Sequence, residues 1–173
     1  MIKHRLWFKR EFAFDLPAEA FPNIVERLRG TPARLEDRVG SLPGKILTKR
    51  EGETWSIQEN VGHLLDVEPL WSGRVEDLLA HKDALRPADL ENRKTHEADH
   101  NSTPLPDLLA SFRKARLGLV AGLDALDEAS ITLSAHHPRL SKPMRMIDLA
   151  FFVAEHDDHH LARITELIHG LAT

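Results

Sequence analysis

The sequence of 173 residues contains neither cysteine nor tyrosine. The absence of cysteine excludes disulfide bonds, thiolate metal ligands, iron–sulfur clusters and a cysteine nucleophile. The absence of tyrosine means that no phenol can act as a general acid. If the protein uses a thiol in its chemistry, that thiol has to come from a second molecule.

The sequence also has no long apolar run and no excess of positive charge. No run approaches the roughly 18–20 apolar residues that a membrane-spanning helix needs, and charges interrupt residues 1–12, where a signal peptide would have its apolar stretch. Lys and Arg number 23 against 27 Asp and Glu, a net charge of −4 without a basic block. We therefore expect a cytoplasmic protein that binds neither membranes nor nucleic acid.

What the sequence does contain is typical of a globular helical protein. Hydrophobic residues make up 42% and charged residues 29%, and the length predicts one domain, residues 1–173. Apolar residues recur at helical spacing in four segments, which two long polar connections interrupt. The segments are residues 18–39, 56–78, 106–126 and 143–168, and the connections are residues 82–106 and 127–142. Strand patterns are weak, so we predict an all-α fold, a four-helix bundle without a sheet.

Two prolines fall inside these helical patterns. Pro69 lacks a backbone N–H and is expected to kink the second segment near residues 65–68. Pro32 interrupts the first segment, which is therefore either one kinked helix or two pieces. The second segment has a clear start, because Ser56 is followed three residues later by a glutamate, the pattern of a capping box.

Histidine is the residue type in which this sequence is unusually rich, with 11 copies. His156 and His160 continue the apolar stripe of the last segment, so their rings project from one face, one helical turn apart. Desolvating two imidazoles is costly unless something satisfies their nitrogens, and a divalent metal ion does so. The alternative is a pair of surface or helix-capping histidines on an acidic face.

Two imidazoles make an incomplete metal site, so a third ligand has to come from another helix. His63, on the flank of the apolar stripe in the second segment, is the best candidate. Glu59 and Glu68 are rival ligands on the same segment. Three imidazoles suit zinc, nickel, copper or iron, so the ligand types alone do not choose the ion.

A second histidine pair occurs at residues 96–100, where the sequence reads H-E-A-D-H. Zinc peptidases carry the same H-E-x-x-H string, but they need it on an amphipathic helix. The flanking residues are polar and offer no apolar face, so we predict a solvated loop and an accidental match. Alternatively, this loop covers the mouth of the bundle and lends His96 or His100 to a substrate. His136 and His137, which precede a proline, are expected to be turn residues.

Two stretches of the sequence form a recognisable pair. The first reads W-S-I-Q-E-N-V-G-H-L-L-D at residues 55–66, and the second reads E-H-D-D-H-H-L-A-R-I at residues 155–164. Together they resemble the two motifs of the DinB/YfiT superfamily. The resemblance implies a four-helix bundle, often paired as a homodimer, with a three-histidine site for zinc, nickel or a similar divalent ion. The implied ligands are His63, His156 and His160, and His159 is left as a neighbour that does not bind the ion.

The resemblance also bears on function. Members with known activities include thiol-dependent S-transferases and a thiol-dependent isomerase, and many others are described as metal-dependent hydrolases. We therefore hypothesise a metalloenzyme whose open metal position serves hydrolysis or thiol transfer to a small electrophilic substrate, with a low-molecular-weight thiol as cosubstrate in the second case. Glu59 and Asp157 are candidate general bases, although each also fits a solvated helix-face carboxylate. The alternatives are a non-catalytic metal-binding bundle and a metal-free helical interaction protein.

Overall fold

The computed structural model describes residues 5–171, so residues 1–4 and 172–173 of the predicted domain lie outside the described residues. It is mostly helical, as predicted. The long elements are α1 (Phe21–Val39), α3 (Ile57–Asp66), α4 (Glu68–Leu79), α6 (Leu105–Asp124) and α8 (Met146–Leu171). The short elements are η1 (Trp7–Lys9), η2 (Ala18–Ala20), α2 (Gly44–Leu47), α5 (Arg93–Glu97), η3 (His100–Ser102), α7 (Glu128–Ile131), β1 (Ser134–His137) and β2 (Lys142–Arg145).

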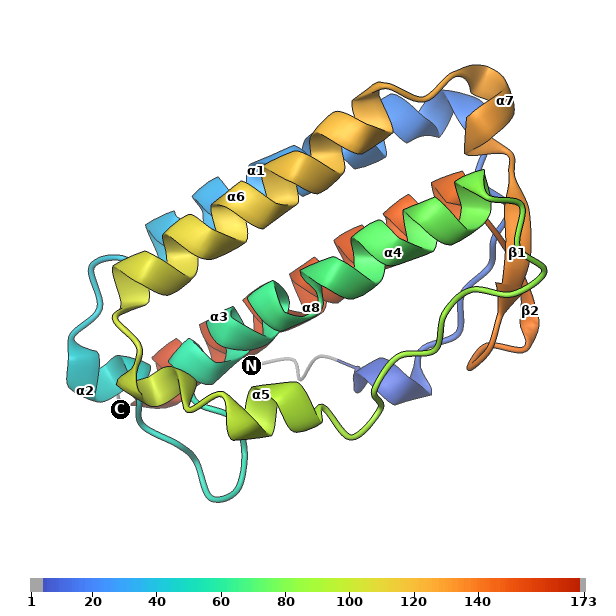
Figure 1. Cartoon of the computed structure of the whole chain (residues 1–173). Helices are drawn as coiled ribbons and strands as arrows, with labels where there is room; N and C mark the ends of the chain where they lie inside the picture. The colour runs from blue at the N-terminus through green and yellow to red at the C-terminus, as the bar shows by residue number, and fades with distance from the viewer. Residues whose placement is uncertain (1–4, 172–173) are drawn as a thin grey trace.

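The long elements form a bundle in which α6 and α8 each pack against both α1 and the α3–α4 pair. In Figure 1, α3, α4 and α6 run in one direction along the bundle, and α1 and α8 run in the other. The chain therefore has to return along the bundle between α4 and α6, and residues 80–104 make this crossover. The long connections in the sequence allow this topology, which differs from a simple up-down-up-down bundle.

The kink predicted near residues 65–68 takes the form of a break between two helices, because α3 ends and α4 begins at Val67. This residue has φ −89° and ψ −9°, and Pro69 lies in the first turn of α4. A proline in a first turn costs little, since the backbone N–H groups there have no partner within the helix. The first segment, by contrast, is a single helix, because α1 continues through Pro32.

The prediction of a fold without a sheet is wrong for residues 134–145. There β1 and β2 pair as an antiparallel hairpin, with Ala135 opposite Met144. As a result α8 begins at Met146 and not at residue 143. Each strand has only four residues, too few for an alternating pattern to stand out in the sequence.

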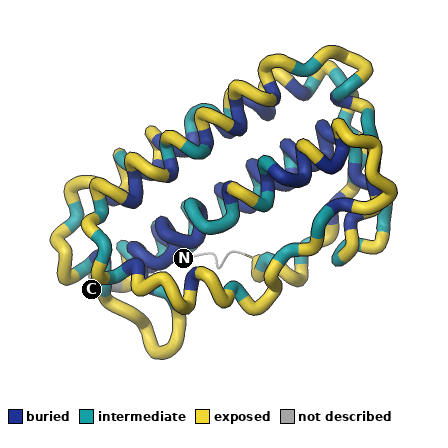
Figure 2. Tube along the Cα trace, viewed as in Figure 1, coloured by how far each residue is buried: buried dark blue, intermediate teal, exposed yellow. Residues whose placement is uncertain are grey.

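Each long helix buries one face and exposes the other, which Figure 2 shows as dark inner and yellow outer turns. This amphipathic pattern is what drives the helices together. Within residues 5–171, no helix combines the length and the apolar character that crossing a bilayer requires.

A buried layer of polar side chains divides the core into two apolar clusters. One cluster surrounds α4 and the first half of α8, and the other surrounds α3 and the last turns of α8. Between them lies what we name the central polar layer, in which each long segment contributes one side chain. Its members are Thr31, Glu68, Arg116 and Asp157. Arg116 forms ion pairs with both carboxylates, and the Thr31 hydroxyl donates to Asp157.

Candidate metal centre

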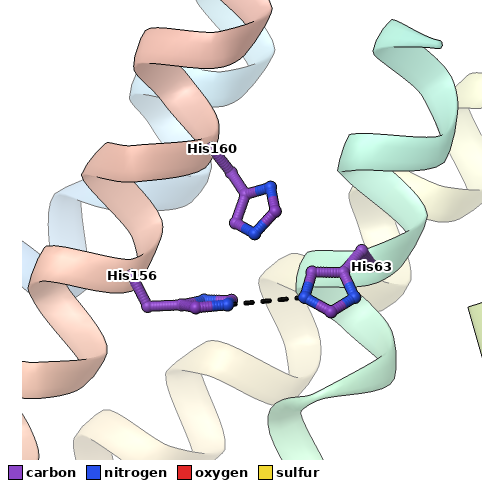
Figure 3. Close-up of side chains that lie close together, drawn as sticks. All are labelled: His63, His156 and His160. Carbon is purple, nitrogen blue, oxygen red and sulfur yellow. Dashed lines mark hydrogen bonds between the residues drawn. The ribbon is translucent and has the colours of Figure 1, made fainter. Parts of the chain in front are cut away.

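The structure brings together the three histidines singled out in the sequence. His63 comes from α3, while His156 and His160 come from successive turns of α8, and all three side chains are buried. One ring nitrogen from each lies within 4.8 Å of the other two. Figure 3 shows the rings converging, with Nε2 of His63 and Nε2 of His156 3.4 Å apart.

Local sequence explains why the rings meet. The spacing of four residues puts His156 and His160 on one face of α8, and their ring centroids lie 4.6 Å apart. The predicted capping box is present at the start of α3, where Ser56 and Glu59 bond to each other's backbone N–H groups. It fixes the start of the helix, which makes about two turns from Ser56 to His63.

Hydrogen bonds on the far side of two rings fix their tautomers. The Thr95 hydroxyl donates to Oδ2 of Asp66 at 2.9 Å, so it can accept from Nδ1–H of His63 at 3.0 Å. Similarly, the Asn60 amide oxygen accepts from Nδ1–H of His160 at 2.9 Å. Both rings then keep the lone pair of Nε2 for the centre of the cluster, which is the arrangement of metal-binding histidines.

The third ring is the least satisfied. Nδ1 of His156 is buried and has no hydrogen-bond partner within residues 5–171, and its Nε2 faces a lone pair of His63. Burial lowers the pKa of His63 to about 4 and holds the pKa of His156 well below its ordinary value. These two rings are therefore neutral at pH 7, the form in which imidazole binds metals.

The cluster lies in a cleft of about 1410 Å³. Three tryptophan rings surround it: Trp7 lies 5.0 Å from His156, Trp55 lies 4.7 Å from His63, and Trp71 lies 5.4 Å from His156, measured between ring centroids. Much of the outer wall comes from segments outside the long helices, namely residues 6–9, 87–95 and 137–139. The cleft is thus an aromatic pocket on the flank of the bundle, with the histidines on its floor.

The predicted general bases lie elsewhere. Burial raises the pKa of Glu59, but its bonds with Arg50 and the Ser56 backbone outweigh this and hold the pKa below its ordinary value. Asp157 is buried in the central polar layer beside Arg116. Among the described residues that line the cleft, neither carboxylate is present, and their role as bases stays a prediction.

The H-E-x-x-H string is not the solvated loop that we predicted, because part of it is helical and its second histidine is buried. α5 ends at Glu97, and His100 is buried with Nε2 2.7 Å from Oδ2 of Asp66. Its ring lies against Gly62, where an added Cβ would come within 2.2 Å of it. His96 is exposed, so the two histidines face different surroundings.

The sequence alone did not identify the residues that form the outer hydrogen bonds of the histidine rings. Asn60 and Asp66 lie three residues before and after His63, on the same helical face, and this spacing was the available signal. Thr95 had no such signal, because only the folded crossover brings it to α3. His159 lines the cleft next to the cluster, with its ring 5.3 Å from that of His160.

Comparisons with known proteins identify the family of the chain and a solved structure with a similar fold. A comparison with curated proteins finds no match. Among solved structures, the chain is similar to YfiT from Bacillus subtilis, with a TM-score of 0.81, 22% sequence identity and 94% of each chain covered. That protein is described as a probable metal-dependent hydrolase with an unusual four-helix bundle topology. The model of the DinB superfamily matches residues 27–164, from α1 to the last turns of α8. With a match over most of its length and the bundle described above, the chain belongs to the DinB superfamily.

Proposed function

We propose that this protein is a metal-dependent enzyme in which His63, His156 and His160 hold one divalent ion, zinc or nickel, on the floor of the cleft. The observation that carries the proposal is the convergence of three buried ring nitrogens within 4.8 Å. Two of the rings are turned by outer hydrogen bonds so that Nε2 faces inward. At the centre of the cluster, Nε2 of the buried His156 lies 3.4 Å from Nε2 of His63, and a cation there would satisfy both nitrogens.

The surroundings favour an open site over a closed structural one. A structural zinc ion normally has four protein ligands, whereas a catalytic one has three. The two carboxylates that the sequence offered as rival ligands are engaged elsewhere: Glu59 bonds to Arg50, and Glu68 pairs with Arg116. Three ligands would leave a coordination position on the side of the cleft.

An ion held by neutral imidazoles supplies Lewis acidity, which acidifies water or a thiol and polarises a carbonyl group. The protein's own side chains provide the rest. Thr95 and Asn60 hold two rings in position, and the tryptophans give the floor of the cleft an apolar lining. The exposed apolar side chains Leu6 and Leu90 also line this space, which suits a small substrate with an apolar body.

Hydrolysis is the reaction we propose first, in line with the description of YfiT. Thiol transfer to a small electrophile uses the same open position, and a low-molecular-weight thiol would then have to bind in the cleft because the chain has no cysteine. The homodimer and the cytoplasmic location implied by the sequence stay predictions.

Metal binding is tested on protein purified without a histidine tag. After chelation, calorimetric titration with Zn²⁺ and Ni²⁺ should give one ion per chain. Replacing His63, His156 or His160 by alanine should abolish this binding, whereas the exposed His169→Ala should retain it. Retained binding in all three variants would refute the site.

Activity is tested on the loaded protein with two panels, one of activated esters and amides and one of thiols with aryl halides. We expect turnover that is lost on chelation and restored by metal. Tight metal binding without turnover on either panel would instead support the non-catalytic metal-binding bundle.

A further inference from the structure

A group of basic side chains lies in the same cleft, beyond the histidine cluster. Arg74 comes from α4, His137 from β1, and Arg139 from the turn between the strands, and all three line the cleft. Figure 1 shows the hairpin beside the end of α4, which brings these segments together. We call Arg74, His137 and Arg139 the basic corner.

The basic corner has more hydrogen-bond donors than acceptors. Nη1 of Arg74 lies 3.1 Å from Nε2 of His137, and the Leu140 backbone N–H donates to Nδ1 of the same ring at 3.2 Å. A neutral imidazole has one acceptor nitrogen, so it cannot serve both donors. Nη2 of Arg139 and Nε1 of Trp71 are buried and have no acceptor within residues 5–171.

The positive charge of the corner is also not neutralised. Arg74 is 1% exposed, and burial, aided by the charge of Arg139, lowers its pKa to about 10. Asp77 is the carboxylate that acts on Arg74, but Lys82 and Arg86 already bind it. Among the described residues, neither arginine of the corner forms an ion pair with a carboxylate. Buried cations without a counter-charge are costly unless an anion joins them.

Aromatic rings connect this corner to the histidine cluster. The guanidinium carbon of Arg74 lies 5.7 Å from the Trp71 ring, and the Trp71 ring lies 5.4 Å from the His156 ring. On the other side, the guanidinium of Arg139 lies 5.8 Å from the ring of Phe152. An apolar wall, roughly the width of one indole, therefore separates the basic groups from the histidines.

We propose that the basic corner binds the anionic oxygen group of a small organic acid, whose uncharged part lies along Trp71 and Phe152 toward His156. Arg139 and Trp71 donate to the anion, with a small turn of the half-buried Arg139 side chain, and Arg74 supplies charge from behind. The substrate of the proposed enzyme is thus an organic acid. Its reacting group and its charged group are separated by roughly the width of one aromatic ring. The inference that this acid reacts near the histidines rests on the proposed function, whereas binding of its anionic group does not require a metal ion.

The test follows Trp71 directly. The chain has three tryptophans, so a ¹H–¹⁵N spectrum shows three indole N–H signals, and Trp71→Phe identifies the one that belongs to Trp71. Metal-free protein is titrated with benzoate, with inorganic phosphate and, as a neutral counterpart, with benzamide. We expect the Trp71 signal to move saturably with benzoate and to stay in place with benzamide. A response to phosphate but not to benzoate would overturn the organic acid and leave an inorganic oxyanion site.

Two variants that each remove one positive charge complete the test, the first in the basic corner and the second as its control. Arg139→Gln should weaken benzoate binding at least about tenfold, the lower limit for losing one hydrogen bond to a charged group. Arg163→Gln removes a charge from the same cleft, but one that already pairs with Glu51 and Glu166, and should change the Kd less than twofold. An unmoved Trp71 signal, an equal response to benzamide, or equal weakening by both variants would overturn the proposal. Because the protein is metal-free, such a failure is separate from any failure of metal binding.

Discussion

Replacing Thr95 by valine removes one hydroxyl from the chain of bonds that orients His63, and leaves the shape of the side chain almost unchanged. Thr95 is 4% exposed and stands between Nδ1 of His63 and Oδ2 of Asp66. In the variant, Asp66 keeps its bond from His100 at 2.7 Å. The ring of His63 loses the acceptor of its Nδ1–H and is free to rotate or to change tautomer.

The expected effect on metal affinity follows from this loss. Outer partners of metal-binding histidines typically contribute 10–100-fold in affinity, which corresponds to about 1.4–2.7 kcal/mol. The lower half of this range applies here, because His160 keeps its own bond to Asn60. We therefore expect Thr95→Val to weaken Zn²⁺ binding about 10–30-fold.

The measurement is a competition titration of Zn²⁺ against a chromophoric chelator at pH 7, with urea unfolding of the metal-free protein as a check of the fold. Thr165→Val is the matched control, since its hydroxyl donates to the Leu161 carbonyl within α8 and touches none of the three histidines. A folded Thr95→Val protein with unchanged affinity would refute the orienting role of Thr95.

Three further predictions concern stability, each measured by urea unfolding of metal-free protein. Gly62→Ala should lower the free energy of unfolding by about 1–3 kcal/mol, because a Cβ would clash with the His100 ring held by its carboxylate partner. Arg116→Met should cost about 3–5 kcal/mol, since it leaves two carboxylates buried without a counter-charge. Burial lowers the pKa of His63 to about 4, so between pH 6.5 and 4 the unfolded chain binds a proton there that the folded chain does not. Stability should therefore be full above pH 6.5 and fall by up to about 3 kcal/mol toward pH 4. An unchanged free energy of unfolding in either variant would contradict the contact that the substitution removes or disturbs. A stability that does not change between pH 6.5 and 4 would contradict the lowered pKa of His63.

The parts of the fold that follow from local sequence were predictable. The four helical segments come from apolar spacing, and the break at Val67 comes from the backbone chemistry of Pro69. The approach of His156 and His160 follows from helical periodicity alone. Their meeting with His63 depends on how two helices pack, and the resemblance to a family supplied what the periodicity could not.

The parts that escaped prediction depend on contacts between distant segments. The crossover reads as a solvated loop, yet His100 is buried because a glycine on α3 leaves room for its ring and Asp66 binds it. Whether a carboxylate is buried and paired is equally hard to predict from the sequence. Asp157 looks like a helix-face acid until α6 places Arg116 beside it.

The outer wall of the histidine cleft is built by short connecting segments, while the bundle behind it is held by its own apolar clusters and the layer around Arg116. Mutations in this wall can therefore change which molecules enter without loosening the scaffold. In evolution, this separation lets the same helical bundle and histidine cluster be combined with different connecting segments at the opening of the cleft.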